Sequence, residues 1–243
     1  MNVLFSIFPW ENLGERPVGF DMGCGSGRWA KLIAPKVHKL HCIDPSSALN
    51  VARRNLKDER ACEFHAGTVS DYVLPERSTD FGYCLGVLHH VPDPAEGIKS
   101  CVRMLKTGAP LLIYLYYALD NRPIWYRSLW RLSNFVRLLI SKMPYRSRFV
   151  VTQIFAGLVY FPMARLAYLL SKAGVNVSNF PLSFYMNASF YTMRTDALDR
   201  FGTRLEKRFT KVEIMKMMED AGLENIVFSD EVPFWCAVGF RSG

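Results

Sequence analysis

Two acids and three alternate glycines have the spacing of a loop that binds a charged ligand. Asp21 precedes Gly23, Gly25 and Gly27, and Asp44 lies 21 residues after the first of these glycines. A glycine loop lets a ligand approach the backbone and exposes amides at the start of the next helix. A carboxylate at position 21 repels a pyrophosphate and attracts an ammonium group. The loop therefore favours a ligand that carries a positive charge.

A dinucleotide is the alternative ligand that the glycines alone leave open. Counted from Gly25, the loop fits G-x-G-x-x-A with Ala30 in last place, and alanine is allowed there. The two acids, rather than the glycines, argue against this alternative.

Two adjacent histidines are a second group of residues that could take part in a reaction. His89 and His90 follow an apolar stretch that ends near residue 88. Imidazole titrates near neutral pH, so either ring suits the removal of a proton from a hydroxyl acceptor. The alternative is that one ring packs against its own loop and caps the backbone. Both interpretations stay open.

Alternating strands and helices must position these residues. Apolar stretches predict strands at 17–22, 39–44, 61–67, 79–87 and 110–117, and amphipathic segments predict helices at 28–34, 46–56 and 94–104. This order predicts an α/β fold with a doubly wound, mostly parallel sheet. Ligands of such sheets bind at the carboxyl ends of the strands, where the glycine loop, Asp44 and the histidines fall.

The positive charge of the chain is concentrated in one segment. The 243 residues carry a net charge of +8, and residues 117–205 hold 12 Lys/Arg against three Asp/Glu. The remainder holds 18 against 19. Apolar residues recur every three or four positions at 124–142 and 152–174, which predicts two helices, and residues 175–203 are predicted to be irregular. We predict a core of residues 1–116 and 206–243, interrupted by a basic, aromatic-rich helical insertion at 117–205.

Three roles for this insertion stay open. It leaves a strand at the ligand edge, so it can be a lid over an acceptor site, with arginines on its wet side. It can also be a membrane-surface element, or a face that binds nucleic acid. No RNA-binding motif supports the last role, which is the least favoured. Tyr117, Asp120, Asn121 and Arg122 are the candidate acceptor contacts, although 118–123 can also be a plain turn.

Cysteine usage and the chain's first residues predict a cytoplasmic protein. The six cysteines form no CxxC pair, and no histidine accompanies them at zinc spacing, so we expect reduced thiols and no metal. The first 15 residues lack the features of a signal peptide. The uncharged, largely apolar stretch 149–164 is 16 residues long and contains Gln153 and Pro162. We therefore expect no membrane span, and peripheral membrane contact stays open.

The D-x-G-x-G-x-G loop with an acid ending the second strand resembles the class I S-adenosylmethionine-dependent methyltransferases. Residues 80–94 ("DFGYCLGVLHHVPDP") look like the fourth-strand segment of the small-molecule branch of that family. Residues 96–116 and 208–231 resemble its later helices and strands, and 235–241 its last, antiparallel strand. The resemblance covers about 16–117 and 206–243. It implies a Rossmann-like sheet with one antiparallel strand.

The resemblance also implies a cofactor, S-adenosyl-L-methionine, and a set of residues that bind it. The glycine loop takes its amino-acid part, and Asp44 takes the ribose hydroxyls. Thr68 stands where many relatives carry an aspartate that binds the adenine amine. The full set of implied cofactor-binding residues is Asp21, Gly23, Cys24, Gly25, Gly27, Asp44, Pro45, Thr68, Val69 and Leu85.

Methyl transfer to a small or lipid-linked acceptor is the predicted function, with oxygen as the target atom. Transfer from a sulfonium depends mainly on alignment, and a base is needed only where the acceptor must lose a proton. An acidic or phosphate-bearing acceptor suits the basic insertion. Two alternatives stay open: an RNA methyltransferase, and a non-catalytic scaffold that binds the cofactor. "GVLHH" lacks the N/D-P-P-Y/F box of nucleic-acid amino-methyltransferases, which disfavours an exocyclic amine in DNA.

Overall fold

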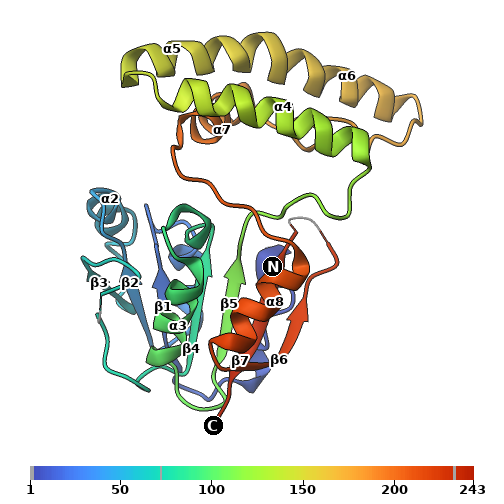
Figure 1. Ribbon diagram of the computed structural model, residues 1–243. Coiled ribbons are helices and arrows are strands. Elements are labelled where there is room, and N and C mark those ends of the chain that lie inside the picture. The colour runs from blue at the N-terminus through green and yellow to red at the C-terminus, as the bar shows by residue number, and fades with distance from the viewer. Residues whose placement is uncertain (1–2, 72, 232–233) are drawn as a thin grey trace. The chain divides into compact units, whose positions relative to one another are not determined.

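A computed structural model describes residues 3–71, 73–231 and 234–243 (Figure 1). The chain divides into two compact units. The sheet unit comprises the residues up to Ala118 and those from Lys207 to Gly243, and the helical unit comprises Leu119–Glu206.

The sheet unit is built on seven strands. They are β1 (Val18–Met22), β2 (Lys39–Ile43), β3 (Cys62–His65), β4 (Phe81–Leu85), β5 (Pro110–Tyr114), β6 (Leu223–Phe228) and β7 (Cys236–Arg241). Their order across the sheet is β3-β2-β1-β4-β5-β7-β6. Strand β7 runs antiparallel to both of its neighbours, and the other pairings are parallel. This confirms the predicted doubly wound sheet with one antiparallel strand.

Helices cover both faces of this sheet. The α-helices are α1 (Ala30–Ile33), α2 (Ala48–Asn55), α3 (Pro94–Met104) and α8 (Lys211–Asp220), and the 3-10 turns are η1 (Val3–Phe5), η2 (Trp10–Asn12), η3 (Ala34–Lys36) and η4 (Leu88–His90). One buried cluster joins the sheet to α1 and α2, and another joins it to α3 and α8. Strand β4 is buried along its whole length, as expected for a strand covered on both faces.

The helical unit contains α4 (Ile124–Ser141), α5 (Tyr145–Phe155), a π-turn η5 (Ala156–Tyr160), α6 (Phe161–Lys172), η6 (Ser183–Tyr185) and α7 (Phe190–Gly202). The α7 helix corrects the prediction that 175–203 is irregular. Ser189 caps it by accepting a hydrogen bond from the Thr192 amide. Met193, Ala197 and Phe201 recur every four residues and are buried, so packing selects a helix that local propensity does not favour.

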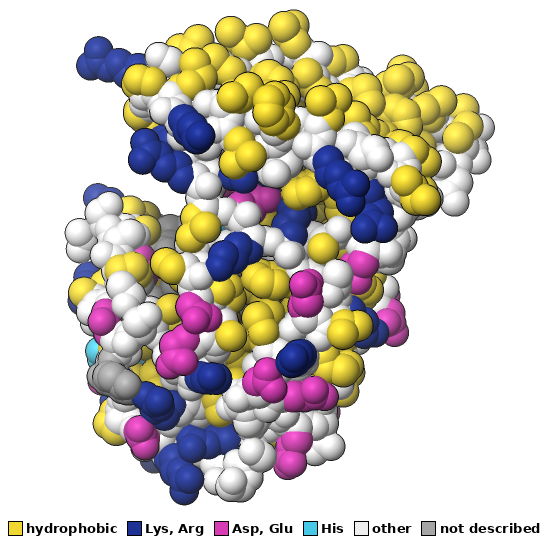
Figure 2. Space-filling view, viewed as in Figure 1, with side chains coloured by type: hydrophobic (Ala, Val, Ile, Leu, Met, Phe, Trp, Pro, Cys, Tyr) yellow, Lys and Arg dark blue, Asp and Glu magenta, His cyan; other side chains and the backbone are white. Residues whose placement is uncertain are grey.

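The second predicted helix is longer than expected. Segments α5, η5 and α6 form one helix, Tyr145–Lys172, and it is long and apolar enough to cross a membrane by length and composition alone. Pro162 does not end it, because that residue stands in the first turn of α6, directly after the π-turn. Only 22% of its most apolar window is buried. Figure 2 shows the hydrophobic side chains that gather over α5 and α6.

The two chain connections between the units leave the sheet unit side by side. The Phe209 amide donates to the Tyr116 carbonyl, and the Ala118 amide donates to the Phe209 carbonyl. The Lys207 amide donates to the carbonyl of His89, in the turn that follows β4. Both connections are therefore fixed at the carboxyl edge of the sheet, where α/β folds bind ligands.

Candidate cofactor and acceptor site

The glycine loop joins β1 to α1, and its three glycines serve different purposes. All three have positive φ angles, +78° at Gly23, +53° at Gly25 and +83° at Gly27. A Cβ at Gly23 would meet Val87 at 2.3 Å, and one at Gly27 would meet Leu56 at 2.6 Å. A Cβ at Gly25 would meet nothing within 4 Å. Gly25 is therefore the point where a ligand can approach the backbone, whereas the other two glycines permit packing.

Asp21 lies beneath this loop as a buried carboxyl group. It is 1% exposed, and neither carboxyl oxygen has a hydrogen-bond partner among the described residues. Burial is the main cause that raises the pKa of Asp21 to about 8. The nearby Tyr83 hydroxyl lowers this pKa in part, although the two groups are not in hydrogen-bond geometry, and the negative charge of Asp44 raises it further. Tyr83 is the register partner of Asp21 on β4. A buried carboxyl with no partner is suited to an ammonium group brought by a ligand.

Asp44 directly follows β2 and ties the loop to the next turn. Its Oδ2 accepts from the Gly25 amide at 2.9 Å, and its Oδ1 accepts from the Ser46 amide at 2.8 Å and the Ser46 hydroxyl at 2.6 Å. The amides of Gly23 and Cys24 both donate to the Ile43 carbonyl. The loop is thus fixed to the end of β2. Both lone pairs of Asp44 Oδ1 are used by Ser46, whereas Oδ2 accepts from Gly25 and keeps a lone pair for a ligand hydroxyl.

A pocket of about 290 Å³ opens beside the loop. Of the predicted site residues, it is lined by Gly23, Pro45, Thr68, Val69 and His90. Six other lining residues were not predicted from the sequence: Met22, Gly67, Ser70, Val87, Val91 and Pro92. Most of these lie in the turns after β3 and β4, so the rule that ligands bind at the carboxyl ends of strands could have found them.

Cys24 and Leu85, two further predicted cofactor residues, do not line this pocket. Cys24 and Leu85 are buried, and Leu85 is the last residue of β4.

Thr68 is exposed, and its hydroxyl accepts from the Ser70 amide at 3.3 Å. The Thr68 amide donates to Asp71 Oδ2 at 2.6 Å. Asp71 is thus a carboxylate near the position where Thr68 replaces the aspartate of many relatives.

The two histidines have different environments. His89 is fully buried, its ring stacks on Tyr116 with centroids 3.6 Å apart, and neither nitrogen has a hydrogen-bond partner among the described residues. Burial lowers its pKa to about 2, and the charges of His90 and Arg208 add to this. His90 lines the pocket. A ring with so low a pKa accepts protons poorly near neutral pH, so His90 is the better candidate base.

The predicted acceptor contacts divide between the two units. Tyr117 belongs to the sheet unit, where its ring packs against Phe234 and Trp235. Asp120, Asn121 and Arg122 belong to the helical unit. The Arg122 guanidinium donates to the Ser178 carbonyl at 2.8 Å and to Asn179 Oδ1 at 2.7 Å. These bonds give Arg122 a structural role in its own unit.

Fold and site together define a class of protein: a doubly wound domain whose glycine loop, with the carboxyl groups of Asp21 and Asp44, suits a ligand that carries an ammonium group and hydroxyls. A family profile described as "Methyltransferase domain" matches residues 20–113. A ubiquinone biosynthesis O-methyltransferase from Pseudomonas savastanoi pv. phaseolicola is 30% identical over 177 residues, which cover 64% of this chain and 74% of that protein.

A protein of the same name from Nitrosomonas europaea is 33% identical over 113 residues, 45% of this chain and 46% of that protein. This chain spans less than half the length of several such curated relatives. A solved S-adenosylmethionine-dependent methyltransferase from Methanosarcina mazei aligns over 97% of this chain and 98% of its own, with a TM-score of 0.59 at 17% identity, which shows a shared fold.

The chain belongs to the class I S-adenosylmethionine-dependent methyltransferases, in the small-molecule branch. This confirms the predicted family and its cofactor, S-adenosylmethionine. The residues present fit that cofactor. Asp21 offers a buried carboxyl to its ammonium group, Gly25 leaves open space beside the backbone, and Asp44 has acceptor capacity for ribose hydroxyls.

Proposed function

We propose that this protein transfers a methyl group from S-adenosylmethionine to a hydroxyl oxygen of a small, apolar acceptor. The observation that carries the proposal is the placement of His90 on the wall of the cofactor pocket, in a turn fixed by the Lys207 amide. The curated relatives named O-methyltransferases of ubiquinone biosynthesis support an oxygen target and a lipid-soluble acceptor.

The cofactor supplies an electrophilic methyl group on a sulfonium centre. The chain's own residues do the rest. The loop from Gly23 to Gly27 and Asp44 hold the cofactor in place, which aligns its methyl group with the acceptor. His90 accepts the proton of the acceptor hydroxyl, and this raises the nucleophilicity of the oxygen. His89 supports the turn by stacking on Tyr116 and takes no proton near neutral pH.

A pair of matched acceptors tests the reaction. Purified protein is incubated with S-adenosylmethionine and either an alkylated catechol or the corresponding alkylated aniline, and products are identified by mass spectrometry. We expect a methyl ether from the catechol and its loss on His90→Ala, with binding of S-adenosylhomocysteine unchanged. Methylation of the aniline alone, or of RNA alone in a parallel reaction, would refute the oxygen target.

We also propose that the helical unit attaches this protein to an anionic membrane surface. Of the 25 large hydrophobic side chains that are exposed among the described residues, 22 belong to the helical unit. Leu158 is 74% exposed, Leu132 63% and Phe135 61%. Monomeric soluble proteins rarely expose apolar surface on this scale, so these side chains require a partner.

The charge of the helical unit indicates what that partner is. Residues 121–195 contain ten Lys/Arg and no Asp/Glu. Each basic residue near an anionic leaflet contributes about 1 kcal/mol of attraction. Apolar side chains combined with this charge match the headgroup and acyl region of a membrane that contains acidic phospholipid.

We favour a helical unit that lies on the membrane over one that crosses it. Polar contacts tie Tyr145–Lys172 to its own unit: the Arg165 guanidinium donates to the Met186 carbonyl at 3.2 Å, and the Arg194 guanidinium donates to Gln153. A crossing would place Arg165 and Gln153 in hydrocarbon, which is costly. The helical unit also encloses a pocket of about 320 Å³ whose lining is mostly apolar, including Leu129, Phe155 and Val159, and this suits a lipid-soluble acceptor.

Liposome flotation tests the membrane proposal. Protein is mixed with vesicles of phosphatidylcholine, with or without phosphatidylglycerol, at two salt concentrations. We expect flotation with the anionic vesicles, weakened by salt and by Leu158→Glu. The matched control is Val212→Glu, which changes a residue that is 76% exposed in the sheet unit. Equal loss in both variants, or no flotation with anionic vesicles, would refute the proposal.

A further inference from the structure

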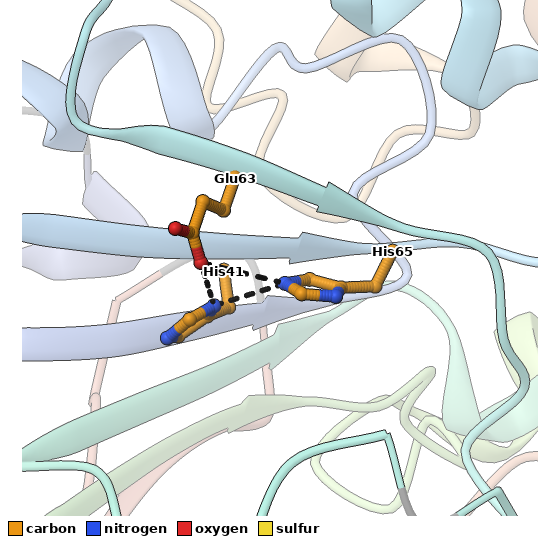
Figure 3. A group of neighbouring side chains, drawn as sticks. All are labelled: His41, Glu63 and His65. Carbon is orange, nitrogen blue, oxygen red and sulfur yellow. Dashed lines mark hydrogen bonds and ion pairs between the residues drawn. The ribbon is translucent and has the colours of Figure 1, made fainter.

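Two histidines and a glutamate converge at the edge of the sheet. His41 lies on β2, and Glu63 and His65 lie on the edge strand β3 (Figure 3). His41 and Glu63 are register partners, and His65 stands two residues beyond Glu63. Since side chains alternate between the faces of a strand, all three lie on one face. Neighbouring Leu40 and Cys42 point to the other face, where they join the cluster with α1 and α2.

Three atoms of this group form a triangle of the size that a metal ion requires. His41 Nδ1 lies 2.9 Å from His65 Nε2 and 3.2 Å from Glu63 Oε2, and the last two atoms are 4.0 Å apart. A point in the plane of such a triangle lies about 2.0 Å from all three atoms, which matches the ~2.0–2.2 Å bonds of zinc to imidazole nitrogen and carboxylate oxygen. The 4.0 Å separation of Glu63 Oε2 and His65 Nε2 is wider than tetrahedral zinc prefers, so a small side-chain rotation that shortens it would complete the geometry.

The surroundings orient these ligands and leave the site open to solvent. Lys39 Nζ binds the other oxygen of Glu63, Oε1, at 2.8 Å, so Oε2 is turned toward the histidines. The side chains of His41, His65 and Glu63 are 13%, 30% and 48% exposed. An ion there could complete its coordination with water. The positive charge of Lys39 opposes a cation, which weakens the site but does not block the ligand atoms.

We propose that His41, Glu63 and His65 bind a divalent transition-metal ion of the zinc class. Imidazole suits zinc, copper and nickel, whereas magnesium and calcium prefer oxygen ligands throughout. The ion fastens β3 to β2 close to the cofactor pocket. The Asp44 amide donates to the His65 carbonyl at 3.1 Å, and the chain continues from His65 into the pocket residues Gly67 and Thr68.

The prediction that the chain holds no metal rested on cysteine and histidine spacing along the sequence. His41 and His65 are 24 residues apart, and only strand pairing brings them together. A search by short spacing does not detect ligands that lie on two paired strands.

Calorimetry with zinc alone tests the site on tag-free protein in the presence of a non-chelating reductant. We expect one Zn²⁺ per chain, and a loss of affinity of about 100-fold or more on His41→Asn or His65→Asn. His38→Asn is the matched control, because His38 lies at the start of β2 and contacts Arg16 instead. Cys62→Ser controls for capture by the neighbouring thiol. Both controls should bind zinc as the wild type does.

Two outcomes would overturn the proposal: no stoichiometric zinc binding, or binding that survives both histidine substitutions. If a histidine variant fails to fold, Glu63→Gln replaces it, since that side chain is half exposed and its loss should weaken zinc binding without disturbing the core. The measurement needs neither cofactor nor acceptor. Its result therefore stands apart from the proposed methyl transfer.

Discussion

Replacing Asp21 by asparagine should change how the stability of the protein depends on pH. Burial raises the pKa of Asp21 from 3.8 to about 8. Between these pH values the native state holds a proton that the unfolded chain has released. A carboxyl with a raised pKa contributes stability that is fully present below pH 3.8 and is lost as the pH rises through 8.

The size of the effect follows from the shift. One pKa unit corresponds to about 1.4 kcal/mol, and the shift is about four units, so about 5 kcal/mol of unfolding free energy disappears between pH 4 and pH 8. Asparagine does not titrate. Its buried amide costs about 1–3 kcal/mol, but this cost is the same at every pH. The free energy of unfolding of the variant, relative to wild type, should therefore rise by about 5 kcal/mol across this range.

Urea unfolding between pH 4 and pH 8 measures this difference, with exposed Asp58→Asn as control. The same variant should bind S-adenosylhomocysteine about 10- to 100-fold more weakly, since a charged acceptor for the ammonium group contributes about 1.5–3 kcal/mol. If the unfolding free energies of Asp21→Asn and wild type run parallel with pH, Asp21 does not hold the extra proton, and our account of its burial is wrong.

Three further predictions concern the loop, the histidines and the helical unit. Gly25→Ala should weaken binding of S-adenosylhomocysteine in calorimetry, whereas Gly108→Ala, with a similar φ of +76° and equally open space, should cost the same ~1–2 kcal/mol of strain and leave binding intact. His90→Phe should lower kcat by about 10²–10⁴, and His89→Phe by less than tenfold. Burial lowers the pKa of His89 from 6.5 to about 2, so unfolding below pH 6.5 takes up a proton, and His89→Phe should reduce the loss of stability there. If the helical unit is a lid, hydrogen exchange in 117–205 should slow when cofactor and acceptor bind together; unchanged exchange would exclude that role.

The sheet and the cofactor loop were predictable because their signals are local. Apolar runs mark buried strands, and D-x-G-x-G-x-G marks a turn with three positive φ angles, which glycine adopts without strain. The roles of the individual glycines were not predictable, because the contacts of Gly23 with Val87 and of Gly27 with Leu56 join distant parts of the chain. The unequal burial of His89 and His90 likewise depends on Tyr116, which belongs to the segment after β5.

The helical unit shows where sequence patterns mislead. Pro162 and Gln153 suggested a broken segment, but a π-turn accommodates the proline, and Arg194 binds the glutamine side chain. Helix α7 was missed because aromatic and threonine residues have weak helix propensity, and its stability comes from packing in a small cluster. In both cases tertiary contacts outweigh the local preference of the chain.

The proposed reaction needs a water-soluble cofactor and a lipid-soluble acceptor at the same site. The cofactor is charged and dissolves in water, whereas the proposed acceptor dissolves in a membrane. Both connections to the helical unit start where Ala118 and Phe209 pair. The returning connection is anchored by Lys207, whose amide donates to the His89 carbonyl and whose ammonium donates to the Pro92 carbonyl. Pro92 and His90 line the cofactor pocket. These two hydrogen bonds join the connection from the helical unit to the turn that carries the candidate base.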